Sequence, residues 1–209
     1  MLKNVRNALA GLALAAVSPM AAAAACTGVS VNNADTSDVT LNGSPATSCL
    51  VAVGNPQSGP NGDPSVFSGT FGTGWSLLGK MSGGAIPATT ISGVQFSGAF
   101  TIDNTTNKAG TWTINASSPV KADLVFAMHA SNRAGNFFFD DIALGTSNAG
   151  NWKIEWHNNG QQIPDFSNLT VFVRDVVGTT VVPVPAALPL MLTGLVGLGL
   201  LARRRRHTA

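Results

Sequence analysis

Apolar and polar residues alternate along much of the chain between residues 26 and 181, a period of two that is typical of strands burying one face. The alternation is clearest at positions 94, 96, 98, 100 and 102 and at positions 152, 154 and 156. We predict eight strands, at residues 47–53, 74–80, 91–102, 111–116, 122–129, 136–144, 152–156 and 169–177.

Clusters of Gly, Pro, Asn and Asp separate these segments and predict turns. The longest cluster, residues 55–64, has too many strand-breaking residues to enter a sheet and predicts a surface loop. No segment before Ala186 shows a convincing helical period. Eight short strands without helices predict an all-β fold, an antiparallel β-sandwich of jelly-roll-like type. The order of its strands stays open.

The N-terminus has the pattern of a secretory signal peptide, which we assign to residues 1–25. Lys3 and Arg6 precede an apolar run at residues 8–17, and small residues follow at 21–25. The run is too short for a permanent membrane span. We expect cleavage after Ala24 or Ala25, where the Ala-x-Ala rule is satisfied.

The C-terminus, residues 182–209, combines a Pro-rich start, an apolar run and a basic end. The uncharged run at residues 184–202 approaches the roughly 20 residues that a membrane-spanning helix needs. Arginine clusters beside such segments stay on the cytoplasmic side, so we assign the orientation of the helix to Arg203, Arg204, Arg205 and Arg206. The preceding part of the chain would then lie outside the cytoplasm.

This tail resembles the PEP-CTERM sorting signal of Gram-negative bacteria, whose motif is usually Val-Pro-Glu-Pro. Here the motif positions are Val182, Pro183, Val184 and Pro185, with Val184 where Glu is expected. The resemblance implies recognition by an exosortase, a membrane transpeptidase that cuts near the motif and passes the protein to the cell surface or matrix. An alternative is an ordinary C-terminal membrane anchor, which would keep its tail.

The central part also resembles the ectodomains that often precede such tails. The matching segments are residues 74–80, the Gly-x-Trp strands at 110–112 and 150–152, and Ser167-Asn168, where Asn168 stands in place of a common His. These matches support the predicted fold and imply no activity.

Residues 26–181 are predicted to form one exported domain. The two terminal segments hold 6 of the 12 Lys and Arg and none of the 10 Asp and Glu, so the domain carries a net charge of −4. Phosphate contacts need clustered basic residues, and we therefore expect no nucleic-acid partner.

Cys26 and Cys49 are the two cysteines of the chain, and in an exported protein they predict a disulfide that pins the new N-terminus. One alternative is a lipidated Cys26, although Ala23 stands where a lipoprotein signal usually has Leu. Zinc binding by two cysteines alone is a weaker alternative, because structural zinc takes four ligands.

The chain lacks a nucleophile elbow, a Walker loop, a dinucleotide fingerprint and a metalloprotease helix motif. We expect His129 to lie on the surface at a strand end and His157 to cap a hairpin. We predict no metal and no cofactor. The calcium candidates are Asp103, Asp140 and Asp141, although Asp140 and Asp141 would point to opposite faces of a regular strand. No pair of carboxylates stands out for glycoside hydrolysis.

Exposed aromatic rings can form a sugar-binding platform, and Trp75, Trp112, Trp152 and Trp156 are available, but most are expected in the core. The sequence predicts an exported non-enzymatic protein, first anchored in the inner membrane with a cytoplasmic C-terminus, then handed by an exosortase to the surface or extracellular matrix. The alternative is a carbohydrate-binding module for exopolysaccharide. A permanently anchored ectodomain or a secreted hydrolase comes third.

Overall fold

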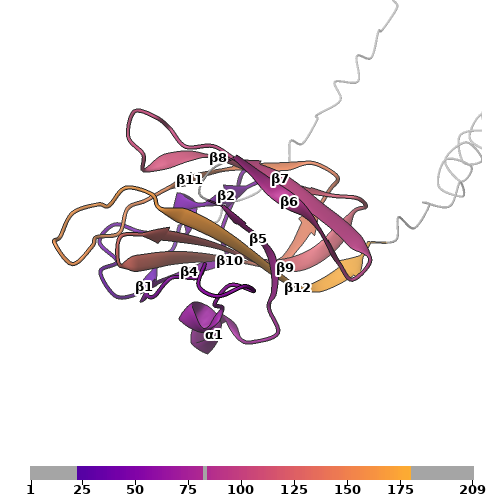
Figure 1. Cartoon of the computed structure of the whole chain (residues 1–209), viewed down its shortest axis with the longest axis horizontal. Coiled ribbons are helices and arrows are strands. Elements are labelled where there is room, and N and C mark those ends of the chain that lie inside the picture. The colour runs from indigo at the N-terminus through magenta and orange to yellow at the C-terminus, as the bar shows by residue number, and fades with distance from the viewer. Residues whose placement is uncertain (1–22, 82–83, 180–209) are drawn as a thin grey trace, which may run out of the picture.

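The computed structural model describes residues 23–81 and 84–179, which are mostly β-structure (Figure 1). The first sheet has the strand order β1 (Thr27–Gly28), β4 (Ser48–Val53), β10 (Arg133–Leu144), β9 (Val120–Ala130), β12 (Asn168–Gly178), β5 (Ser76–Met81). The second has the order β11 (Asn148–Lys153), β8 (Ala109–Ala116), β7 (Val94–Phe100), β6 (Gly84–Ile91). A short pair, β2 (Thr40–Leu41) and β3 (Ser44–Pro45), completes the strands.

The all-β prediction is confirmed, and each of the eight predicted segments overlaps a strand. Neighbouring strands are antiparallel except β1 and β4, which are parallel. Sequence reasoning missed β6, because Pro87 interrupts its pattern and a register shift between Ile86 and Thr89 breaks its pairing with β7. The predicted strand at residues 152–156 ends at Lys153, although Ile154 and Trp156 remain buried beyond it.

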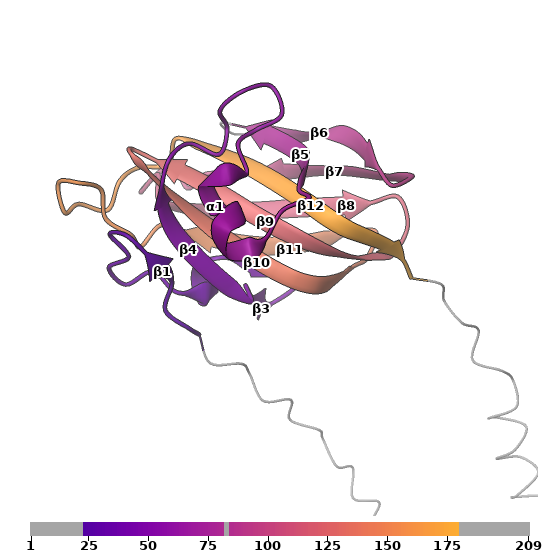
Figure 2. The ribbon, with the colours of Figure 1, turned by 90° about the horizontal axis from the view of Figure 1, so that it is seen from below.

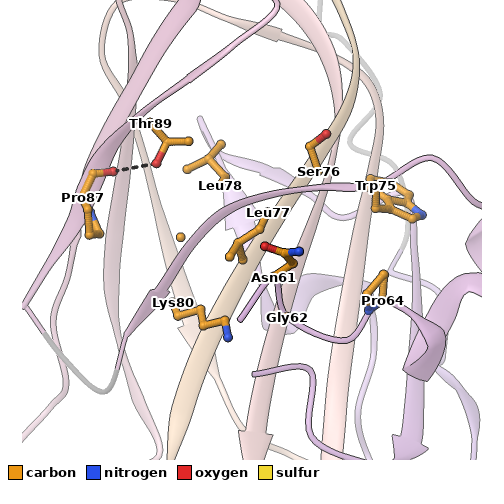
Figure 3. Close-up of a pocket in the computed structure, with 11 residues that line it drawn as sticks. Asn61, Gly62, Pro64, Trp75, Ser76, Leu77, Leu78, Lys80, Pro87 and Thr89 are labelled. Atoms are coloured by element: carbon orange, nitrogen blue, oxygen red, sulfur yellow. Dashed lines mark hydrogen bonds between the residues drawn. The ribbon is translucent and has the colours of Figure 1, made fainter. Parts of the chain in front are cut away.

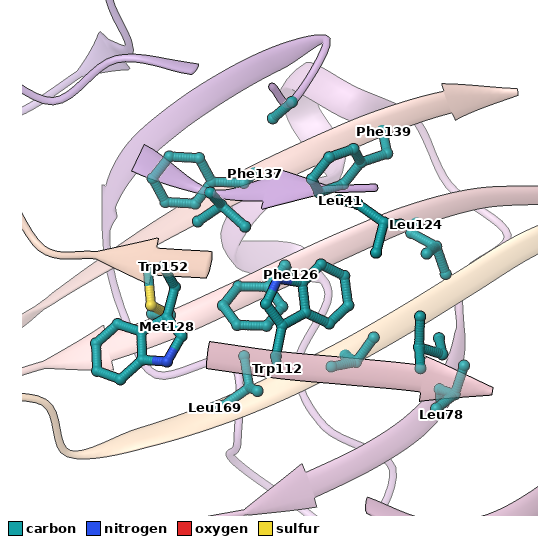
Figure 4. Close-up of a cluster of buried hydrophobic side chains, with 14 of the residues drawn as sticks. Leu41, Leu78, Trp112, Leu124, Phe126, Met128, Phe137, Phe139, Trp152 and Leu169 are labelled. Carbon is teal, nitrogen blue, oxygen red and sulfur yellow. The ribbon is translucent and has the colours of Figure 1, made fainter. Parts of the chain in front are cut away.

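The buried faces of the two large sheets meet in one hydrophobic core, which is rich in aromatic rings (Figure 4). Phe126 of β9 lies at its centre, with its ring centroid 4.6 Å from that of Trp112 and 6.1 Å from that of Phe100, both on the four-stranded sheet. Phe100 in turn stacks on Trp152 at 4.8 Å. Phe100 and Trp152 face inward, as the alternation at positions 94–102 and 152–156 predicted.

A short helix, α1 (Ser65–Phe71), covers the outer face of the six-stranded sheet (Figures 1 and 2). The expectation of no helix before Ala186 was therefore wrong. The helix has seven residues, and its apolar signal is little more than the i, i+4 pair Phe67 and Phe71, too short for a period to be recognised. It ends at Gly72, whose φ of 78° suits glycine and whose N–H donates to the carbonyl of Ser68.

Helix α1 and the sheet form a second apolar cluster, so that β9 is buried on both faces. Phe67 and Phe71 pack against Val125, Ala127 and Phe172 on the outer face. The inward-facing residues of β9 belong to the main core. We expected strands buried on one face only. Because α1 covers its outer face, β9 is buried on both.

The first described residues are tied to the domain by backbone hydrogen bonds. The amide of Thr36 donates to the carbonyl of Ala24 at 2.9 Å, and the amide of Cys26 donates to that of Ala34 at 2.9 Å. The disulfide predicted between Cys26 and Cys49 is confirmed. It joins the residue before β1 to β4, and it rules out a lipid on the Cys26 sulfur in this form of the protein.

Two predictions fall largely or wholly outside the described residues. They are the signal peptide, apart from residues 23–25, and the sorting tail at residues 182–209. Within residues 23–81 and 84–179, no helix combines the length and the apolar character needed to cross a membrane.

Replacing Cys26 and Cys49 together by Ser should lower the free energy of unfolding by about 3 kcal/mol, because the bridge closes a loop across a sequence separation of 23 residues. Urea unfolding with and without a reductant measures the effect. The wild type should lose stability in reductant while the double variant is unaffected. A wild type indifferent to reductant would argue against a stabilising bridge.

Candidate functional site

The two histidines of the described chain lie in different surroundings and make ordinary contacts. His129 lies near the end of β9, as expected, and is half-buried, and burial lowers its pKa. Its Nδ1 lies 3.5 Å from the amide nitrogen of Asn168 on the neighbouring β12. His157 lies in the loop after β11, where its Nδ1 is 3.3 Å from the side-chain oxygen of Gln161. Both side chains have amide partners.

The calcium candidates do not gather into one acidic cluster. Asp140 and Asp141 lie at a bulge in β10, between Phe139 and Ile142, and the bulge leaves both exposed. Asp141 forms a salt bridge with Lys121 at 2.6 Å. Asp103 accepts a hydrogen bond from the amide of Thr105, which lowers its pKa. Among the described residues, no group of three or more His, Cys, Asp or Glu could hold a metal.

Three of the four tryptophans are core residues, as expected. Trp112, Trp152 and Trp156 are at most 2% exposed, and the indole N–H groups of Trp112 and Trp152 donate to the carbonyls of Thr40 and Thr101. Their rings therefore offer no platform to a sugar. Trp75 is half-buried, and its indole N–H donates to the carbonyl of Gly72 at 2.7 Å.

Trp75 lies at one end of a groove of about 660 Å³ at the edge of the molecule (Figure 3). Strand β5, the edge strand of the six-stranded sheet, forms the floor. One wall comes from the loop before α1, with Asn61, Gly62 and Pro64. The other comes from the bulge in β6, with Pro87 and Thr89.

The backbone of this edge is irregular on both sides of the groove. Leu78 of β5 has no register partner on β12, because Val171 pairs with Gly79 and Phe172 with Leu77. Across the groove, Pro87 has no N–H to donate. Gly79 permits the close approach of the two strands, since a Cβ there would lie 2.7 Å from a methyl group of Ile86.

Lys80 is the one charged residue among the described residues that line the groove. Its ammonium group donates to the carbonyl of Gln57 at 2.8 Å and also to that of Gly59, which holds the loop over the sheet. Within the described part of the chain, it forms no salt bridge with a carboxylate. An ammonium group has three donors, so one remains for a ligand.

Buried polar side chains lie beside Lys80 on the outer face of the sheet. The register places Thr170 next to Lys80, and Asn136 on the far side of Ala127. Asn136 and Thr170 are fully buried, and in the described chain the side-chain oxygens of both lack hydrogen-bond partners. The outer face thus changes from apolar under α1 to polar toward the groove.

Arg174 of β12 fixes the position of Trp75. Its guanidinium carbon lies 4.2 Å from the Trp75 ring centroid, and its Nε donates to the carboxylate of Asp123 at 2.9 Å. It also donates to the carbonyl of Phe71 at 2.7 Å, at the end of α1. Sequence reasoning missed this arrangement, because Asp123 and Arg174 are 51 residues apart and no local pattern joins them.

A second ion pair that sequence reasoning missed is Asp38 with Lys153. Asp38 closes a 3₁₀ turn (Thr36–Asp38), and its side chain accepts a hydrogen bond from the amide of Asp35. Its carboxylate is buried and lies 3.2 Å from the Lys153 ammonium group. Burial raises the pKa of Asp38 to about 6, and Lys153 opposes that rise. The turn is thereby held against the edge strand β11.

A comparison with known proteins finds no family model, no curated protein and no solved structure that matches this chain.

Arg174→Met should lower the free energy of unfolding by about 3 kcal/mol, because it leaves the carboxylate of Asp123 buried without a counter-charge. Adding Asp123→Asn should restore part of this loss, as a double-mutant cycle in urea would show. Lys108→Met is the control, since its pair with Asp165 is exposed and should contribute less than about 1 kcal/mol. Equal losses for Arg174→Met and Lys108→Met would contradict this account.

Asp38 should make the folded state less stable as the pH rises. The folded pKa of about 6 lies above the ordinary value of 3.8. The associated stabilisation is therefore complete below pH 3.8 and is lost as the pH rises through about 6.

Asp38→Asn removes this titration. The free energy of unfolding of the variant, relative to that of the wild type, should therefore rise by up to about 3 kcal/mol between pH 4 and pH 7. Urea unfolding at both values measures the gain, with Asp165→Asn as the exposed control. A constant difference between variant and wild type would show that Asp38 titrates normally.

Proposed function

We propose that this chain is an exported, non-enzymatic protein that a C-terminal sorting signal delivers to the bacterial surface or extracellular matrix. The sorting part rests on the order of the tail: the motif Val182 to Pro185, the apolar run and the four arginines. The structural support for export is the disulfide between Cys26 and Cys49, since such bonds persist in oxidising compartments.

We further propose that the two sheets are the layers of a jelly-roll-like β-sandwich, the cargo of the sorting signal. Two features support this arrangement. The sheets share one core. The chain also passes from one sheet to the other between β5 and β6, between β8 and β9, between β10 and β11, and between β11 and β12. Such repeated crossing is typical of strands wrapped around a common core.

The partners of the proposed protein are an exosortase-type transpeptidase and, before processing, the inner membrane. No nucleic-acid partner is proposed, because the part of the chain between the two terminal segments has a net charge of −4. The proposal of a non-enzymatic role is supported by the contacts of His129 and His157, whose side-chain partners are amides.

The mass of the protein isolated from its native cells tests the sorting proposal. We expect a product that begins after Ala24 or Ala25 and has lost the tail close to residues 182–185. Such a product would distinguish sorting from permanent anchoring, because an anchored protein keeps Arg203 to Arg206. A mature mass that includes the whole tail would contradict sorting by cleavage.

Replacing Arg203, Arg204, Arg205 and Arg206 together by Gln should prevent tail removal, because the cluster would no longer hold the C-terminus in the cytoplasm. The fraction of tail-bearing protein, measured by mass spectrometry of membrane and extracellular fractions, should rise to nearly all of the chain. Lys121→Gln, a charge change on β9, should be processed normally. Normal processing of the arginine variant would refute the assigned role.

A further inference from the structure

We propose that the groove along β5 binds an oligosaccharide that carries a carboxylate on an otherwise neutral chain. The groove is lined by Trp75, Asn61, Ser76, Lys80 and Thr89 and is walled by Pro64 and Pro87 (Figure 3). This inference goes beyond the proposed sorting function and does not depend on the fate of the tail.

The lining matches the mixed surface of a sugar chain. A sugar presents hydroxyl groups around its rim and C–H groups on its faces. Asn61, Ser76 and Thr89 supply amide and hydroxyl groups, while Trp75, Pro64 and Pro87 supply apolar surface. Trp75 is held by its hydrogen bond to Gly72 and by the guanidinium group of Arg174, so its position is set before a ligand arrives.

The single positive charge of the groove, on Lys80, favours a ligand that carries one carboxylate. Lys80 offers its remaining N–H, and no acidic residue is among the described residues that line the groove. A charge-assisted hydrogen bond from ammonium to carboxylate is stronger than one between neutral groups. The domain as a whole has a net charge of −4 and repels a polyanion, which favours a saccharide with sparse carboxylates.

The shape of the edge favours a saccharide over a peptide strand. A peptide that extends a sheet needs a regular row of N–H and C=O groups on the edge strand. Leu78 lies at a register irregularity in β5, so that row is interrupted. From Trp75 to Lys80 the extended chain runs about 16 Å, longer than a single sugar ring, so an oligomer fits better than a monosaccharide.

The test is isothermal titration of the protein, as isolated from its native cells, with aldouronic acid oligosaccharides that carry a glucuronate. The same oligosaccharides with the carboxyl group reduced to an alcohol are the neutral control. A peptide of equal charge is the control for a strand partner. We expect the acidic oligosaccharides to bind about tenfold more tightly than the reduced ones.

Lys80→Gln should abolish that preference, since glutamine keeps a donor for the loop carbonyls but has no charge. The control is Lys121→Gln, which also removes one positive charge and should leave binding unchanged. Lys121 lies near the start of β9, far along the strand from Ala127, which lies level with Lys80 in the sheet. Thr89→Val, on the other wall, should weaken both forms equally and is informative even if Lys80→Gln does not fold.

Four results would overturn the proposal: no binding of any acidic oligosaccharide, equal binding of acidic and reduced forms, unchanged preference in Lys80→Gln, or equally tight binding of the acidic peptide. Each of them leaves the sorting proposal standing, because the mass of the mature protein tests that separately.

Discussion

The structure depends on the burial of β9 on both of its faces. Its inward side chains pack against the four-stranded sheet, with Phe126 between Trp112 and Phe100. Its outward side chains Val125 and Ala127 pack under α1. A strand that buries both faces away from water gains hydrophobic stabilisation from each of them. The neighbouring strands β10 and β12 satisfy the backbone groups of β9. The other elements are arranged around this strand.

This packing limits where a ligand can bind. The core takes Trp112, Trp152 and Trp156, and α1 covers much of the outer face of the six-stranded sheet. The groove lies at the edge at β5, where the two sheets end and a loop folds over them. The same Arg174 that joins β12 to the end of α1 also holds Trp75 at that edge. Stability of the outer layer and the form of the groove are therefore linked.

The sequence predicted those features that local patterns encode. The alternation at positions 152, 154 and 156 placed two tryptophans in the core, and the two cysteines of an exported chain predicted the disulfide. Helix α1 was not predicted, because a segment of seven residues with two phenylalanines is too short to show a helical period. The groove was not predicted, because Asn61, Lys80 and Thr89 come from three separate segments. They lie near one another only through the strand order, which periodicity does not encode. Asp123 and Arg174 meet only once β9 and β12 are paired.

Native-state hydrogen exchange tests the central role of β9 most directly. If β9 is the doubly buried centre of the fold, its amides at residues 122–129 should exchange only through global unfolding, with the largest protection of the chain. The edge strands β5 and β6, which have one neighbour each in their sheets, should exchange faster through local opening. Exchange of the β9 amides at the rate of those edges would contradict the account.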